Sequence, residues 1–218
     1  MNHPAVVRAL SVALLLTPLF AAAAAPSAAG SQLEKLSPMP AADDTTADGP
    51  RHCTQDRTWC VQALRADESA LATLMVEETM AGAREPLNRA VTLRVPQGAR
   101  LAVWPNIIRL PAHRVEGGEV QDVLVAAVVQ QPGKPAWLHV GQVRHLADDV
   151  QTDGDLLVVP WQPGSSLDVS PSTDALPQLK YVSGERAACP ADRVFRSVGG
   201  RYVPDRPLPA CATAAGQP

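Results

Sequence analysis

The side chains most able to do chemistry in this chain are those of four cysteines: Cys53, Cys60, Cys189 and Cys211. Their spacings, Cys-x6-Cys and Cys-x21-Cys, match no zinc knuckle, and the Cys-x-x-Cys spacing of redox motifs is absent. We therefore expect two disulfides, Cys53–Cys60 and Cys189–Cys211, with a Cys53–Cys211 bridge as the alternative pairing. Loop-closure entropy gives about 2.5 kcal/mol for the shorter loop and about 3.4 kcal/mol for the longer one.

Histidines are the next candidates, as metal ligands or bases. His139 and His145 stand six residues apart in one predicted strand. At about 3.3 Å per residue, roughly 20 Å separates them, which is too far to share one ion. We expect these two histidines, like His52 and His113, to lie at the surface or partly buried. The sequence predicts no metal and no cofactor.

Acidic residues gather around one predicted turn: Asp148, Asp149, Asp153 and Asp155. Oxygen-rich loops of this kind can hold calcium. The later Glu of a calcium-binding EF-hand loop is missing, and Asp153-Gly154 is also ordinary hairpin-turn chemistry. We expect a plain turn, with calcium as the alternative. The adjacent pair at 77–78 would face apart on a strand, which makes it a poor acid/base pair.

Catalytic and nucleotide-binding motifs are missing from the sequence. It contains no Gly-x-Ser-x-Gly nucleophile elbow, no phosphate-binding glycine loop and no dinucleotide fingerprint. Catalytic groups can still converge from distant segments. A non-enzymatic role is therefore expected, with a hydrolase built from converging acids or histidine as an alternative.

The first twenty-five residues predict the compartment. Arg8 precedes an apolar stretch that Thr17 and Pro18 interrupt, and a run of alanines follows. The stretch is shorter than the roughly 20 residues of a membrane-spanning helix, so residues 1–25 indicate a cleavable signal peptide rather than an anchor. The mature chain is expected to be periplasmic or secreted, without a membrane span. Disulfides form in such oxidising compartments.

Composition divides the rest of the chain. Residues 26–50 are rich in Ala, Ser, Pro and Asp without hydrophobic periodicity and are expected to form a disordered tether. Residues 51–211 are expected to be one domain, and residues 212–218 a flexible tail. The chain has 19 basic against 22 acidic residues, which disfavours nucleic acid and other polyanions as partners.

The domain is expected to be mainly β. The 21 prolines disfavour long helices, and several short segments alternate apolar and polar residues between turn signals. The apolar run at 123–129 predicts a central strand, and residues 120–146 predict a hairpin. Residues 67–83 fit a strand better than a helix. The expected fold is a single antiparallel β-sandwich or curled meander with little helix, stapled by disulfides.

The tip of this hairpin carries the one family resemblance. A strand of Val, Leu and Ala, a turn containing Gly, and a second strand resemble the central unit of secreted periplasmic lysozyme inhibitors. In that family a loop rich in Ser and Gly, with a Tyr, plugs the enzyme's cleft; here the loop reads QQPGKPAW and lacks the Ser and Tyr. The resemblance implies a binding tip at Gln131, Gly133, Lys134 and Trp137. Lys134 would face acidic catalytic groups and Trp137 would anchor the loop; a plain hairpin tip with a core tryptophan is the alternative.

The sequence thus predicts an exported β domain with a non-enzymatic binding role, its partner an extracytoplasmic protein or a cell-envelope ligand. Inhibition of a cell-wall hydrolase such as lysozyme is the first alternative, and hydrolysis by converging acids the second.

Overall fold

A computed structural model describes residues 30–39, 49–64, 70–174, 176–185, 187 and 189–213. The predicted signal peptide, residues 1–25, lies outside these ranges, as do residues 214–218 of the predicted tail. Nearly all regular structure in the described ranges is antiparallel β-sheet, which confirms the mainly β prediction. The described helical part is one turn, α1 (Ala210–Thr213).

Three sheets make up the fold. The central sheet has the order β1-β8-β11-β12-β13, with β7 beside β11; its strands are β1 (Gln32–Lys35), β8 (Asn106–Arg109), β11 (Val123–Gln130), β12 (Ala136–His145), β13 (Val150–Trp161) and β7 (Arg100–Val103). The second sheet follows chain order with β2 (Ser37–Pro38), β3 (His52–Cys53), β4 (Trp59–Leu64), β5 (Leu71–Glu78) and β6 (Leu87–Arg94). The third contains β14 (Ser166–Ser170), β15 (Gln178–Val182), β16 (Arg193–Val198) and β17 (Arg201–Pro204). A separate hairpin pairs β9 (His113–Val115) with β10 (Gly118–Val120).

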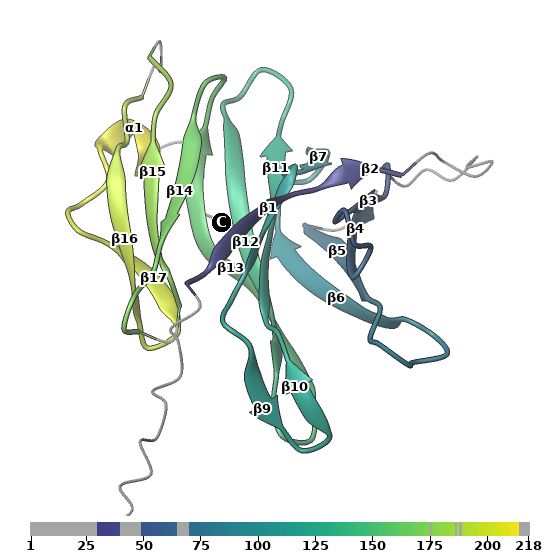
Figure 1. Cartoon of the computed structure of the whole chain (residues 1–218). Coiled ribbons are helices and arrows are strands. Elements are labelled where there is room, and N and C mark those ends of the chain that lie inside the picture. Colours follow the sequence, from purple (N-terminus) through teal and green to yellow (C-terminus); the bar gives the residue numbers. More distant parts are fainter. Residues whose placement is uncertain are drawn as a thin grey trace, which may run out of the picture.

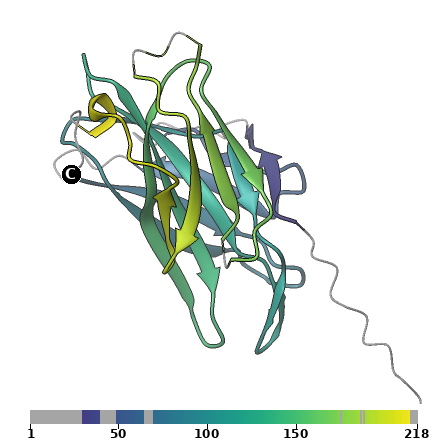
Figure 2. The same cartoon turned by 90° about the vertical axis from the view of Figure 1, so that its left-hand side faces the viewer.

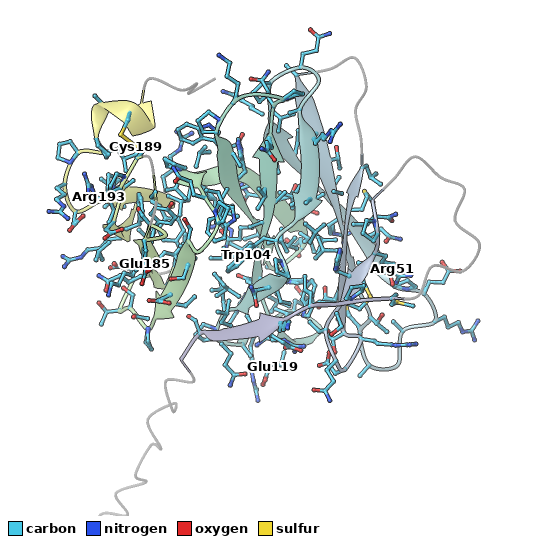
Figure 3. All side chains as sticks on the ribbon, turned by 90° about the horizontal axis from the view of Figure 1, so that it is seen from above. Arg51, Trp104, Glu119, Glu185, Cys189 and Arg193 are labelled. Carbon is cyan, nitrogen blue, oxygen red and sulfur yellow. A yellow bond between two sulfur atoms is a disulfide. The ribbon has the colours of Figure 1, made fainter. Side chains whose placement is uncertain are left out.

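The central sheet lies between the other two (Figure 1), and the third sheet covers it when that side faces the viewer (Figure 2). Seen from above, Trp104 lies between the sheets, Cys189 lies beside the third sheet, and Arg51 lies on the side of the second (Figure 3). The expected sandwich therefore has an additional sheet, and its two interfaces enclose separate hydrophobic cores.

Strand β11 explains why two cores form. Val123, Val125 and Ala127 belong to the core against the second sheet, and Leu124 and Ala126 to the core against the third. A strand with both faces covered has no position for a polar residue, so its sequence is continuously apolar. The prediction of a central strand at 123–129, and of its hairpin with β12, is confirmed.

Both preferred disulfides are present. Cys53 and Cys60 are directly opposite each other on β3 and β4, with 4.0 Å between Cα atoms. Cys189 and Cys211 join α1 to the segment before β16, with 5.8 Å between Cα atoms. Residues 71–78 form β5, as the strand interpretation of that segment predicts.

The tether prediction is wrong for residues 30–39. Gln32–Lys35 pairs with β8 and Ser37–Pro38 with β3. Leu36 between them is only 1% exposed and packs in the core that contains Trp59. Burial of this leucine contributes roughly 1.5–3 kcal/mol to docking of the segment, in addition to the strand pairing. Residues 40–48 of the predicted tether lie outside the described ranges.

The turn predicted at Asp153-Gly154 is also wrong, because β13 continues through it. Val140 pairs with Leu157 and Gln142 with Asp153, so Gly141 faces three residues of β13. This bulge includes Asp155, whose φ is 51°, a left-handed conformation that Asp tolerates better than most residues. The turn-forming residues thus kink a long strand and leave it unbroken.

Candidate functional site

A cleft of about 1080 Å³ opens around this bulge. Its lining comes from β5, β6, β9, β12, β13 and β17, from the β16–β17 turn, and from the segments that precede β9, β11 and β15. Its charged and titratable lining comprises Arg94, His113, Asp122, Arg144, Asp153, Asp155 and Arg201. Leu71, Leu110, Pro111, Leu156 and Leu176 add apolar lining. This volume lies just above the range of about 300–1,000 Å³ that is usual for small-ligand sites.

Two glycines allow β6 to approach the bulge closely. A Cβ atom on Gly154 would lie 1.7 Å from the carbonyl oxygen of Thr92, and one on Gly141 would lie 2.4 Å from Cγ1 of Val91. Real Cβ contacts are never this short. Glycine at 154 therefore brings β6, with Arg94 at its end, to the cleft.

Asp155 joins the bulge to the neighbouring strand β12 of its own sheet and to β6 of the second sheet. Its Oδ1 accepts a 2.7 Å hydrogen bond from Nδ1 of His139, and its Oδ2 accepts one of 2.7 Å from the backbone N–H of Arg94. His139 is 3% exposed, so the expectation of a surface or partly buried histidine is wrong here. The ring tolerates burial because the carboxylate accepts its N–H.

A second histidine of β12, His145, belongs to a buried triad. His145 Nε2 is 2.8 Å from Oε2 of Glu78, and its Nδ1 is 3.3 Å from Oδ1 of Asp122. All three side chains are at least nine-tenths buried. Hydrogen bonding to Asp122, and then to Glu78, raises the pKa of His145 to about 9 against the desolvation of the ring. His145 is therefore a buried imidazolium at neutral pH, and the expectation of a surface or partly buried position is also wrong for it.

His113 borders the triad from the β9 side. Its Nε2 donates to the carbonyl oxygen of His145 at 3.2 Å and lies 4.0 Å from Oδ1 of Asp122. Its side chain is 40% exposed, in agreement with the sequence expectation for this residue. The spacing of acidic residues and histidines along the sequence does not predict this grouping, because β5, β9, β11 and β12 meet only in the folded chain.

Three arginines face the cleft without carboxylate partners. Among the residues that the structure describes, no acidic side chain lies within ion-pair distance of Arg94, Arg144 or Arg201. The guanidinium of Arg144 donates to neutral Gln151 at 2.6 Å, and its buried Nε has no hydrogen-bond partner in that part of the chain. Sequence analysis missed all three, since they come from β6, β12 and β17.

The acidic residues near the predicted turn take separate roles. Asp149 accepts from the backbone N–H of Val150, Asp153 accepts from Gln151, and Asp155 forms the bridge described above. In the described ranges, no group of three or more His, Cys, Asp or Glu side chains is arranged to hold a metal ion.

The binding tip implied by the lysozyme-inhibitor resemblance lies elsewhere. Gly133 and Lys134 are exposed in the turn after β11, and Gln131 is half-buried and donates to the carbonyl oxygen of Gln97. Trp137 is 8% exposed within β12, opposite Val129 and Pro160. These four residues are at the opposite end of β12 from the cleft, which uses Gln142 and Arg144.

Comparison with known proteins adds no relative: no protein-family model, no curated protein and no solved structure matches the chain. No helix in the described ranges is long and apolar enough to span a membrane. Functional inference therefore depends on the cleft and its side chains.

Proposed function

We propose that this protein is an exported binding domain whose cleft takes a ligand with an anionic group. The three cleft arginines carry this proposal, because none of them has a carboxylate partner in the described chain. Both oxygens of Asp155 and one of Asp153 accept hydrogen bonds within the protein. The guanidinium groups thus keep unused donors that a carboxylate or phosphate of a ligand can accept.

Export is the second part of the proposal. The sequence pattern of residues 1–25 supports it, and two disulfides suit an oxidising compartment. N-terminal sequencing of the protein recovered from the periplasm or medium of the producing cells tests this. A mature N-terminus between residues 24 and 30 is expected, and a full-length cytoplasmic product would contradict export.

Isothermal titration calorimetry with small anions tests the binding function. Acetate, N-acetylalanine, inorganic phosphate and sulfate are the probes, each at low and moderate salt. Arg144→Gln is expected to weaken binding of the preferred anion about tenfold, as loss of one charge-assisted hydrogen bond predicts. Arg114→Gln, an exposed arginine on β9 outside the cleft, is the matched control and leaves affinity unchanged. Absence of binding by every anion would refute the proposal.

A hydrolase is the second candidate, because the cleft brings Asp122, Asp153, Asp155 and His113 around one cavity. Release of soluble sugars or peptides from purified cell-wall material would support this candidate, provided that Asp122→Asn abolishes the release. Unaltered cell walls after prolonged incubation would argue against it.

Inhibition of a cell-wall hydrolase is the third candidate, and the exposed turn at Gly133 and Lys134 supports it. The expected result is loss of lysozyme activity on addition of the protein, reversed by Lys134→Glu. Full lysozyme activity with every lysozyme type in the presence of the protein would rule it out.

A further inference from the structure

The formal charges of the buried triad do not balance within the triad. Glu78 and Asp122 both bind the single imidazolium of His145, so two carboxylates share one cation. The triad therefore keeps one negative charge. All three side chains are at most 10% exposed, and a charge left uncompensated at such a site is costly.

Asp122 is the triad member that presents this charge to the cleft, because it lines the cavity whereas Glu78 and His145 do not. Its Oδ1 takes the hydrogen bonds from the backbone N–H of His145, at 2.8 Å, and from Nδ1 of the same residue. In the described chain its second oxygen, Oδ2, has no hydrogen-bond partner. One oxygen is thus held in place while the other is left to accept a donor from the cavity.

The other titratable group beside Asp122 does not use that oxygen. His113 lies 4.0 Å from Oδ1, and its Nε2–H already points to a backbone carbonyl. The three arginines of the cleft make no ion pair with Asp122. The cavity therefore carries guanidinium donors and, separately, a buried carboxylate acceptor.

We propose that the cleft binds a zwitterionic ligand of the amino-acid or short-peptide class, with its ammonium group on Asp122 and its carboxylate on the arginines. This inference rests on the proposed function and names its ligand class. A cavity of about 1080 Å³ holds a short peptide, and the leucines and Pro111 that line it supply contacts for apolar side chains. The opposite charges at the two ends of such a ligand offset the free-energy cost of removing water from the charged groups of the cleft.

Calorimetry with three matched probes tests the proposal on the unmodified protein at pH 7. Dialanine carries both charges, N-acetyl-dialanine only the carboxylate, and dialanine amide only the ammonium group. Dialanine is expected to bind at least about tenfold more tightly than either analogue, as loss of one charged hydrogen bond predicts.

Variants test which cleft residues bind each end of the ligand. Asp122→Asn is expected to lower the affinity for dialanine to that for N-acetyl-dialanine, and to leave the affinity for N-acetyl-dialanine unchanged. Arg144→Gln is expected to weaken both carboxylate probes and to spare dialanine amide, while Arg114→Gln changes none of them. Thermal unfolding of each variant checks its fold, and the probe series on the unmodified protein remains decisive where Asp122→Asn does not fold.

The outcomes separate the two proposals. Equal affinity for dialanine and N-acetyl-dialanine would overturn the zwitterion inference and leave anion binding intact. Binding of dialanine amide alone would overturn the anion-binding function and with it the zwitterion inference. No binding of any probe would overturn the inference, and failure of the simple anions as well would overturn both.

Discussion

Nε2 of His145 lies 2.8 Å from Oε2 of Glu78, and this hydrogen bond joins β12 of the central sheet to β5 of the second sheet. Trp59 packs edge-on against the same imidazole, with 6.4 Å between ring centroids. The contact therefore holds two sheets together at the margin of their hydrophobic core. It also sets the position of Asp122 at the cleft, because the opposite ring nitrogen faces that carboxylate.

Stability is expected to fall with rising pH because of this imidazolium. The pKa of His145 is about 9 in the folded protein against 6.5 for an ordinary histidine, so the folded state binds more protons between these values. The stabilisation is complete below about pH 6.5 and is lost as the pH passes 9, by about 3 kcal/mol in all. Urea unfolding at pH 6.5 and pH 9.5 measures it.

A histidine variant identifies the source of this slope. His145→Gln is expected to remove most of the pH dependence, whereas His113→Gln, at a half-exposed ring, is expected to keep it. An unchanged slope in His145→Gln would show that another group is responsible.

Asp155 is expected to be more costly to replace than Asp153, its neighbour in the cleft. Asp155→Asn keeps a residue that tolerates φ of 51°, but the amide has one acceptor oxygen for two donors. Leaving the buried His139 N–H without an acceptor costs roughly 2 kcal/mol. Asp153→Asn is the control, since its contact with Gln151 is exposed, and a loss below about 0.5 kcal/mol is expected there. Equal losses in the two variants would contradict the bridging role of Asp155.

The positions that sequence reasoning predicted well are those determined by local pattern. The run 123–129 is apolar because both faces of β11 are covered, and the short separation of Cys53 from Cys60 suits neighbouring strands. These features depend on residues close together in the chain. Leu36 shows the limit, since it is the buried leucine of a short, mostly polar segment whose few apolar residues do not alternate as in a half-buried strand.

The cleft could not be predicted in the same way. Arg94, Arg144 and Arg201 are scattered over more than a hundred residues, and the chain as a whole is slightly acidic. Net charge disfavours polyanionic partners and gives no indication that the fold gathers three arginines at one cavity. Turn residues at 153–154 likewise indicated a chain reversal, because local sequence does not distinguish a turn from a bulge that a neighbouring strand stabilises.

Gly154 is expected to tolerate no side chain. A Cβ atom there would lie 1.7 Å from the carbonyl oxygen of Thr92, which is backbone and cannot turn aside. Gly154→Ala must therefore move β6 away from β13, at a cost of at least about 3 kcal/mol.

Gly98→Ala is the control: φ of 71° strains the alanine, but no atom lies within 4 Å of its Cβ, so a loss of about 1 kcal/mol is expected. Denaturant unfolding compares the two variants, and a Gly154→Ala loss no larger than that of Gly98→Ala would show that β6 and β13 are not in close contact.

The disulfide between Cys189 and Cys211 is expected to stabilise the third sheet from its periphery. The bond closes a loop of sequence separation 22 that includes β16 and β17, whereas the Cys53–Cys60 loop has a separation of 7. Replacing both cysteines of the longer loop by alanine is expected to lower the free energy of unfolding by about 3.4 kcal/mol, because the unfolded chain regains the entropy of that loop. Removing the Cys53–Cys60 pair should cost about 2.5 kcal/mol by the same relation, with an added loss because both cysteines are buried.

Urea unfolding of the two double variants measures both losses, and non-reducing peptide mapping confirms the pairing beforehand. Four free thiols in the exported protein, or unchanged stability in both variants, would contradict the stapling role.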